Sequence, residues 1–360
     1  MKSGITRKFW KGKKVFVTGH TGFKGSWLCL FLKIMGAKVT GYALPPKTKP
    51  SLFKLAKVDS ILEKSIIADV RNYKRLNREI KKSRADIIFH LAAQPLVRRS
   101  YIETKETFET NIIGTLNILE TVRKIKYIKS TIIITSDKVY DVRKNRIFKE
   151  SDTLGGFDPY SSSKVCCEYI FSSYMNSFFK NNSRQNLATV RAGNVIGGGD
   201  YSQDRLIPDI LSFAKKYNKI ILRNPNSVRP WQHVLEPLNG YLILAEKLYK
   251  NDKKISRVEQ NWNFGPNVTN CKSVKYIGKF FAKQLNIKIK IVRKRSRIFK
   301  PETNFLRLNN SKSKKLLNWN PKWSLNKSLK KILDWQKLSK NYNPKKVCED
   351  QIRDFILNLK

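Results

Sequence analysis

The feature that most constrains this chain is a cluster of three glycines directly after a short apolar run near its start. Val15-Phe-Val-Thr18 has the β-branched and aromatic character of a buried strand, and Gly19-His-Thr-Gly22-Phe-Lys-Gly25 follows it at once. Ser26 to Met35 then has the pattern of a buried helix closed by Gly36. Glycines at such a turn let the backbone bend tightly and bring helix N–H groups to an anion, typically a dinucleotide pyrophosphate. We therefore predict a dinucleotide site, with an ordinary glycine turn as the alternative.

Further runs of strand length alternate with helical patterns along the first half of the chain. Lys38-Val-Thr-Gly-Tyr42, Asp86–His90 and Thr131–Thr135 are strand-like, whereas Phe108 to Val122 carries apolar residues at helical spacing. Strands that alternate with helices predict βαβ units and a parallel sheet. After Arg191, glycines and prolines break this alternation, which indicates a second, loop-rich lobe.

The predicted fold class is therefore α/β, a Rossmann-type doubly wound parallel sheet with a smaller mixed α/β C-terminal substrate domain. We expect the first domain over residues 10–192, a partly interleaved second domain over 193–343 and a tail over 344–360. Within the second domain we expect a strand around Lys288–Arg293 and a helix around Ser328–Gln336. The stretch from Asp350 to Lys360 has the pattern of a short terminal helix.

A tyrosine and a lysine four residues apart form the second candidate site. Tyr160-Ser-Ser-Ser-Lys164 places a phenol and an ammonium on one helix face. The lysine charge should lower the tyrosine pKa, and a phenolate beside a nicotinamide is suited to taking a proton as hydride leaves a carbon. The pair also occurs by chance, so its weight comes from the glycine loop upstream.

Ser136-Asp137-Lys138 follows the run that ends at Thr135, where the strands of an open α/β sheet face the ligand crevice. Ser136 is a candidate hydrogen-bond partner of substrate. Asp137 is a candidate general acid if burial keeps it protonated, and Lys138 a candidate charge or base. Ordinary turn chemistry is the alternative for this segment.

The acidic residue expected about 20 residues after the glycine loop is missing, and Lys47 and Lys49 lie there instead. The choice between NAD and NADP therefore stays open. Asp69 is a candidate ligand of the adenine amine, with a helix N-cap as the alternative.

Composition bounds the remaining functions. The chain has 73 Lys and Arg against 27 Asp and Glu, a formal net charge of +46, which would attract nucleic acid, nucleotides or anionic membrane. Basic residues are abundant throughout, so a solvated surface without a specific nucleic-acid partner is favoured. Five cysteines without zinc-ligand spacing favour reduced thiols in the cytoplasm, and three histidines make a metal site unlikely. We expect neither a membrane span nor a signal peptide.

Together these residues resemble the extended short-chain dehydrogenase/reductase family, and within it the nucleotide-sugar 4,6-dehydratases of the CDP-glucose subgroup. The resemblance covers roughly residues 10–336. It is carried by Val15–Trp27, His90–Val97, Thr135–Lys138, Asp158–Lys164, Arg191–Asp200 and Arg229–Val234.

The resemblance implies dehydration of CDP-D-glucose to CDP-4-keto-6-deoxy-D-glucose, a lyase reaction with an internal hydride cycle on NAD. Tyr160 would take the proton of the C4 hydroxyl while hydride leaves C4, a base would remove the C5 proton, Asp137 would protonate the leaving C6 hydroxyl, and hydride would return to C6. Related dTDP-sugar enzymes have Thr-Asp-Glu where this chain has Ser136-Asp137-Lys138. The C5 base therefore stays open, since Lys138 must be neutral to act as a base and otherwise would stabilise the enolate.

The resemblance also implies the binding residues and a homodimer built on Phe108–Val122 and Tyr160–Phe179. His233 has a packing role as its alternative, and Asn111 resembles the family's structural asparagine. The cofactor set is Gly19, Thr21, Gly22, Phe23, Gly25, Asp69, Val70, Leu91, Ala92, Ala93, Asn111, Tyr160 and Lys164, and the substrate set is Ser100, Asn194, Arg205, Arg229 and His233.

Two other functions stay open at this point. The first is an epimerase on the same scaffold, or a dehydratase for another nucleotide hexose. The second is a basic nucleic-acid-binding protein.

Overall fold

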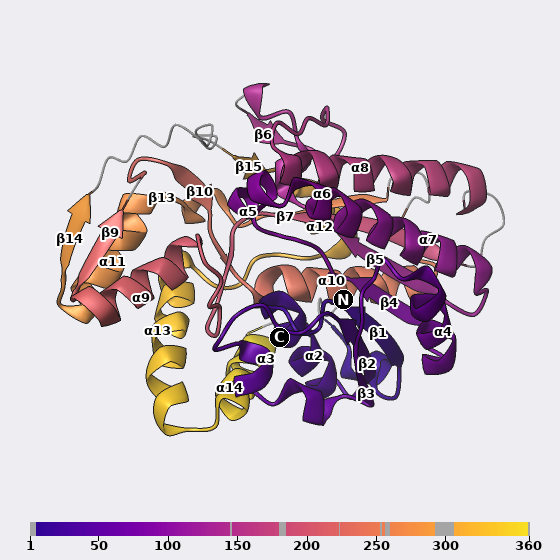
Figure 1. Cartoon of the computed structure of the whole chain (residues 1–360), viewed down its shortest axis with the longest axis horizontal. Coiled ribbons are helices and arrows are strands. Elements are labelled where there is room, and N and C mark those ends of the chain that lie inside the picture. Colours follow the sequence, from indigo (N-terminus) through magenta and orange to yellow (C-terminus); the bar gives the residue numbers. More distant parts are fainter. Residues whose placement is uncertain are drawn as a thin grey trace.

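The computed structural model describes residues 5–144, 146–179, 185–222, 224–252, 254–255, 260–291 and 306–358. At its centre lies a seven-stranded sheet in which every pair of neighbours is parallel, in the order β12-β7-β5-β4-β1-β2-β3 (Figure 1). The strand order reverses between β1 and β4, as in doubly wound sheets. The predicted Rossmann-type α/β class is confirmed.

The four strands predicted from the sequence are all present. They are β1 (Lys14–Thr18), β2 (Lys38–Ala43), β4 (Ile87–His90) and β5 (Ser130–Ile134). Three further strands that the sequence analysis did not find complete the sheet: β3 (Lys64–Ile67), β7 (Asn186–Ala192) and β12 (Asn261–Phe264). Residues of β4, β5 and β7 are buried throughout, because helices cover both faces of the sheet.

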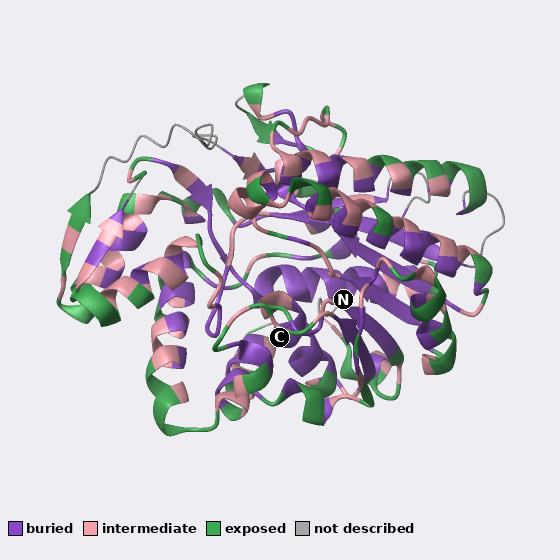
Figure 2. Cartoon of the chain, in the orientation of Figure 1, coloured by how far each residue is buried: buried purple, intermediate pink, exposed green. Residues whose placement is uncertain are grey.

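Two helical layers cover the sheet. On one face α4 (Tyr73–Ser83), α7 (Gly114–Lys124) and α8 (Pro159–Tyr174) pack side by side, and on the other face lie α2 (Phe23–Ile34) and α10 (Leu235–Tyr249). Figure 2 shows the strands and the inward faces of these helices as buried. The helix predicted from Phe108 to Val122 starts as a π-helical turn, Glu109–Ile113, and continues as α7.

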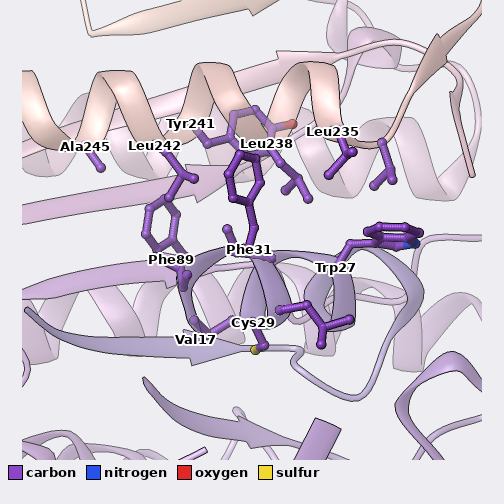
Figure 3. Close-up of a cluster of buried hydrophobic side chains, with 14 of the residues drawn as sticks. Val17, Trp27, Cys29, Phe31, Phe89, Leu235, Leu238, Tyr241, Leu242 and Ala245 are labelled. Atoms are coloured by element: carbon purple, nitrogen blue, oxygen red, sulfur yellow. The ribbon is translucent and has the colours of Figure 1, made fainter. Parts of the chain in front are cut away.

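The core between α2 and α10 shows why these segments are helical. Leu235, Leu238, Tyr241, Leu242 and Ala245 recur at helical spacing on α10 and point toward α2 and the sheet (Figure 3). Below them lie Phe31 of α2, Val17 of β1 and Phe89 of β4, all buried. Burial of such side chains contributes roughly 1.5–3 kcal/mol each.

The second lobe has a small core of its own. It consists of the parallel pair β9 (Lys219–Leu222) and β14 (Lys288–Ile291) with α9 (Leu206–Tyr217), α11 (Val274–Leu285) and α13 (Leu325–Asn341) packed around it. The strand predicted over Lys288–Arg293 is confirmed as far as Ile291, and residues 292 and 293 lie outside the described residues. The predicted helix around Ser328–Gln336 is confirmed as part of α13.

The two segments of the chain interleave. Helix α10 and strand β12 come from the second segment but pack on the first-domain sheet. The predicted terminal helix is confirmed as α14 (Pro344–Leu357), which begins six residues earlier than expected; residues 359 and 360 lie outside the described residues. It packs on α2, with the Phe355 ring centroid 6.5 Å from that of Phe31.

The remaining elements of the described chain are short. The short helices are α1 (Arg7–Trp10), α3 (Leu52–Leu55), α5 (Val97–Ile102), α6 (Thr104–Phe108) and α12 (Ser311–Leu317). The short strands pair as β6 (Ile147–Phe148) with β15 (Arg307–Leu308), β8 (Val195–Ile196) with β11 (Gln232–His233), and β10 (Val228–Pro230) with β13 (Cys271–Ser273).

None of the helices in the described part of the chain combines the length and apolar character that crossing a membrane requires. Nor do the described residues contain a group of three or more His, Cys, Asp or Glu side chains placed to hold a metal ion.

Candidate active site

The glycine loop packs against the neighbouring strand end. Gly19 closes β1 with φ of +76°, and a Cβ atom there would lie 2.7 Å from the Ala92 nitrogen. Only glycine fits this left-handed conformation and close approach without strain. Leu91 and Ala92 in turn donate their N–H groups to the Thr18 carbonyl and hydroxyl at 3.2 and 3.1 Å. The loops after β1 and β4 therefore meet at the point where the strand order reverses.

The start of α2 has the properties of an anion site. Gly22 is the N-cap, no side chain caps the helix, and its first turn has no acidic residue. The first backbone N–H groups of the helix lack intrahelical acceptors, and the helix dipole favours a negative charge there. Gly25 lies so close to Gly19 that a Cβ atom would overlap the Gly19 carbonyl oxygen. Thr21 and Phe23 belong to the same turn, and the Thr21 hydroxyl donates to the Leu44 carbonyl at 2.8 Å.

Asp69 lies just beyond β3, where it binds Arg71. Its carboxylate accepts the Arg71 backbone N–H at 2.8 Å and the guanidinium at 2.6 and 2.9 Å. Partial burial acts to raise the pKa of Asp69, but the hydrogen bonds and charge of Arg71 outweigh it and lower that pKa. The alternative role, a helix cap, belongs to Asn72, whose side chain accepts from the Arg75 N–H. Asp69 is therefore ionised and partly exposed just beyond the carboxyl end of β3.

Asn111 connects three segments of the site. Its side-chain oxygen accepts the Gln94 N–H at 2.8 Å, and its nitrogen donates to the Ser163 hydroxyl at 2.8 Å and the Gln94 carbonyl at 3.3 Å. These bonds link the π-helical turn to the loop after β4, which contains Leu91, Ala92 and Ala93, and to α8. Val70 is buried beside them, and its carbonyl accepts from Asn117 at 2.9 Å.

Helix α8 presents the predicted tyrosine and lysine. Asp158 caps the helix through the Ser161 N–H, and Pro159 occupies its first turn, so the helix starts directly before Tyr160. Tyr160 and Lys164 are both buried. The Lys164 ammonium donates to the Ile134 carbonyl at the end of β5 at 3.0 Å, which brings α8 against that strand end.

The expected lowering of the Tyr160 pKa by Lys164 is wrong for the chain in this structure. The pKa of Tyr160 is raised to about 12, chiefly by burial and also by the charge of Asp137. A hydrogen bond with Ser136 and the charge of Arg205 act in the opposite direction. Desolvation of the lysine also lowers the Lys164 pKa. The physical reason is that sequence spacing gives the charge of a neighbour but not the cost of burying the phenolate.

Ser136, Asp137 and Lys138 form the start of a 3₁₀ turn at the end of β5. Ser136 caps this turn by accepting the Lys138 N–H at 3.2 Å, and its hydroxyl donates to Asp137 Oδ1 at 3.2 Å. The second oxygen, Asp137 Oδ2, is buried and has no hydrogen-bond partner in the described residues. Burial raises the pKa of Asp137 against the charges of Lys138 and Arg229, which favours the protonated acid. Lys138 itself is only partly buried.

The substrate candidates divide into two groups. Arg205 lies at the start of α9, and its charge acts on Tyr160. Arg229 lies on β10, and its charge acts on Asp137. Both arginines therefore lie near these two side chains. Asn194 lies in the loop between β7 and β8, and its carbonyl accepts the Gln232 N–H at 3.1 Å. The buried Ser100 hydroxyl accepts the Tyr160 N–H at 3.1 Å and donates to the Val97 carbonyl at 2.6 Å. Ser100 thus holds the start of α8, and its sugar contact stays a prediction.

His233 lies in a packed, buried environment, and its predicted substrate contact stays a prediction. Its ring is fully buried, with centroids 5.9 Å from Trp27 and 4.8 Å from Trp323, and its Nδ1 accepts the Leu235 N–H. Burial lowers the pKa of His233 to about 3, so the ring is neutral. The packing alternative is therefore the one that the structure favours.

Two residues near the site were missed by the sequence analysis. Lys24, inside the glycine loop, has its ammonium 5.8 Å from the centre of the Tyr241 ring. Burial and the charges of Arg205 and Lys164 together lower the pKa of Lys24 to about 7, although Asp137 opposes them. The Tyr241 hydroxyl is buried without a hydrogen-bond partner in the described residues. One sequence feature could have identified Lys24: it is a charged residue within a glycine loop that binds its ligand through backbone groups.

A family model described as GDP-mannose 4,6 dehydratase matches residues 16–332. The chain belongs to this family. It is 46% identical to the CDP-glucose 4,6-dehydratase of Salmonella typhimurium, over 92% of this chain and 93% of that protein. It is 24% identical to the human dTDP-D-glucose 4,6-dehydratase, over 95% of each chain.

Solved structures of the same fold include both dehydratases and epimerases. The dTDP-glucose 4,6-dehydratase of Bacillus anthracis in complex with NAD superposes with a TM-score of 0.75 at 23% identity, covering 93% of this chain and 100% of that one. The epimerase Mth375 of Methanothermobacter thermautotrophicus gives 0.78 at 19% identity, covering 97% and 96%. At these identities the likeness supports the fold and does not choose between the activities.

The packing of the glycine loop predicts a difference between two alanine variants. Gly25→Ala should lower the free energy of unfolding by about 1–3 kcal/mol, because the new Cβ overlaps backbone atoms of Gly19. Gly22→Ala is the matched control, since its Cβ meets only the Gly19 oxygen at 3.4 Å and the loss should stay below about 1 kcal/mol. Urea unfolding measures both, and equal midpoints for the two variants would contradict the packing described here.

Proposed function

We propose that this chain dehydrates CDP-D-glucose to CDP-4-keto-6-deoxy-D-glucose, with NAD as a cofactor that is regenerated within each cycle. The observation that carries the proposal is the convergence of Tyr160, Ser136 and Asp137 at the carboxyl end of β5, beside the glycine loop. The 46% identity over 92% of the chain to a CDP-glucose 4,6-dehydratase supports the choice of nucleotide. The domain over residues 10–192 would hold the cofactor and the one over 193–343 the substrate.

The residues of the chain fit NAD. The uncapped start of α2 would receive the pyrophosphate, and the Gly19–Ala92 contact forms the floor of the crevice beside it. Asp69 is ionised at the adenosine end, and Lys164 is placed to bind the nicotinamide ribose. The NAD complex of the related dTDP-glucose 4,6-dehydratase of Bacillus anthracis supports NAD as the cofactor. When bound, NAD supplies the acceptor and later the donor of hydride.

Tyr160 acts on the C4 hydroxyl in this proposal. Its buried phenol must lose a proton to become the base, and the positive charge of Arg205 already favours the phenolate. Lys164 lies one helical turn away on the same face of α8, where its ammonium binds the Ile134 carbonyl. Ser136, hydrogen-bonded to the phenol, orients it toward the sugar.

Asp137 acts on the C6 hydroxyl. Burial raises the pKa of its carboxyl and so favours the protonated acid, and Oδ2 has no hydrogen-bond partner in the described residues, so it can meet a leaving hydroxyl group. Lys138 adjoins it and either removes the C5 proton in its neutral form or stabilises the enolate that forms. Arg205 and Arg229 would bind the diphosphate, with Asn194 beside them.

We also propose a homodimer in the cytoplasm that serves deoxysugar biosynthesis, such as that of lipopolysaccharide O-antigen. The outer face of the α7–α8 layer exposes apolar side chains that a partner would cover, namely Ile113, Tyr169 and Phe178 at 39, 61 and 50% exposure. The five cysteines are free thiols, as a reducing compartment would keep them.

Incubation of purified protein with NAD and, separately, CDP-, UDP-, GDP- and dTDP-glucose tests the function. We expect only CDP-glucose to lose the mass of one water, measured by mass spectrometry. Loss of water from another sugar alone would move the substrate to that nucleotide, and altered stereochemistry at constant mass would show an epimerase. No reaction at all, with nucleic-acid affinity that falls steeply with salt, would favour the basic binding protein.

Replacement of the acid tests the elimination step separately. Asp137→Asn should lower turnover roughly 10²- to 10⁴-fold, because an amide has no acidic proton for the leaving hydroxyl. Oxidation at C4 does not need that proton, so mixing the variant with CDP-glucose should build up reduced cofactor absorbance. An Asp137→Asn variant that turns over the nucleotide sugar at the full wild-type rate, without a requirement for the acid, would point to epimerisation instead of elimination.

A further inference from the structure

The part of the molecule that the proposed function leaves unexplained is a buried ion pair beneath the catalytic segment. Glu168, on α8, and Arg191, on β7, face each other with side chains only 1% and 3% exposed. Two hydrogen bonds join them, from Arg191 Nε to Glu168 Oε1 at 2.8 Å and from Nη2 to Oε2 at 3.0 Å. Burial acts to raise the Glu168 pKa, but the charge and hydrogen bonds of Arg191 outweigh it and lower that pKa, so the pair stays ionised.

Each partner of the pair binds one end of the segment that contains Ser136, Asp137 and Lys138. The Thr135 hydroxyl, directly before the segment, donates to Glu168 Oε1 at 2.6 Å. Arg191 Nη1 donates to the Tyr140 hydroxyl, just after the segment, at 2.8 Å, and Tyr140 donates onward to Asn263 at 2.7 Å. The catalytic segment is therefore held at both ends by one ion pair.

The same pair also fixes the helix that carries the tyrosine. Tyr160, Lys164 and Glu168 follow one another at four-residue spacing, so they lie on one face of α8. Glu168 Oε2 further accepts from Thr189 of β7 and Asn261 of β12, each at 2.8 Å. Rotation or sliding of α8 relative to β5 would break several of these bonds at once.

Stability alone is a weak explanation for such a pair. Removing two charges from water costs free energy that their attraction only partly returns, and well-packed apolar residues often serve a fold equally well. What the pair supplies that apolar residues lack is fixed geometry, because bidentate guanidinium–carboxylate contacts specify both distance and angle.

We propose that Glu168 and Arg191 are positioning residues that set the Asp137 acid against the Tyr160 phenol by clamping Thr135 and Tyr140. This inference rests on the proposed dehydratase function. Direct replacement of Glu168 or Arg191 would leave an uncompensated buried charge, so the clamp is better tested through the neutral residues that it holds.

Thr135→Val removes the hydroxyl that binds Glu168 at almost constant shape. We expect kcat for dehydration to fall roughly 10- to 100-fold, because misplaced acid–base groups lose rate steeply. The KM for CDP-glucose should stay within about two-fold, because the substrate contacts do not change. Thr135→Ser keeps the hydroxyl and should recover most of the rate. Tyr140→Phe, which frees the other end of the segment, should also lower kcat with little change in KM.

Thr131→Val is the matched control for Thr135→Val. Thr131 lies on β5, the strand that Thr135 directly follows, is fully buried, and its hydroxyl has no hydrogen-bond partner in the described residues. The kcat of Thr131→Val should equal that of the wild type. The thermal unfolding midpoints of Thr131→Val and Thr135→Val should agree within a few degrees.

Three outcomes separate the possibilities. A Thr135→Val kcat no lower than that of Thr131→Val, or a Thr135→Ser variant as slow as Thr135→Val, would overturn the clamp in an active enzyme. If Thr135→Val does not fold, the kcat and KM of Tyr140→Phe decide instead. A wild-type protein that dehydrates no nucleotide sugar would reject the proposed function, and with it any role of the clamp in dehydration.

Discussion

The parallel pairing of β1, β4 and β5 is the constraint on which the candidate site depends. Thr18 pairs with His90 and His90 with Ile133, so all three strands end at one edge of the sheet. The glycine loop, the loop after β4 and the Ser136–Lys138 segment therefore meet there without any local sequence signal that links them. Helix α8 completes the arrangement because Lys164 binds the last carbonyl of β5.

Burial controls the chemistry of this edge more than formal charge does. Although the chain carries a net charge of +46, the pKa of Asp137 is raised and that of Lys24 is lowered to about 7, both chiefly by desolvation. Asp137, whose raised pKa favours the protonated acid, and the Tyr160 phenol suit a reaction that moves protons at the C4 hydroxyl, at C5 and at the C6 hydroxyl of the sugar. The charges of the surrounding cations change these pKa values less than burial does.

Sequence predicted most of what depends on local pattern. The glycine loop, four strands, the α8 pair and the acid at the end of β5 all follow from short-range signals. Strand β3 was missed because only one of its four residues is buried, and β7 and β12 were missed because polar residues interrupt their apolar pattern. The Glu168 network and the pKa of Tyr160 were out of reach because they depend on burial and on contacts between residues up to 123 positions apart. The packing of His233 between two tryptophans was also out of reach, because a histidine in a matching segment gives no sign of them.

The central claim is that hydride leaves C4 and returns to C6 of the same sugar, between a phenol and a buried acid at one sheet edge. The most direct test is to convert CDP-glucose labelled with deuterium at C4 and locate the label by NMR. We expect deuterium in the C6 methyl group of the 4-keto product. Deuterium lost to solvent, or retained at C4 of an epimerised sugar, would contradict it.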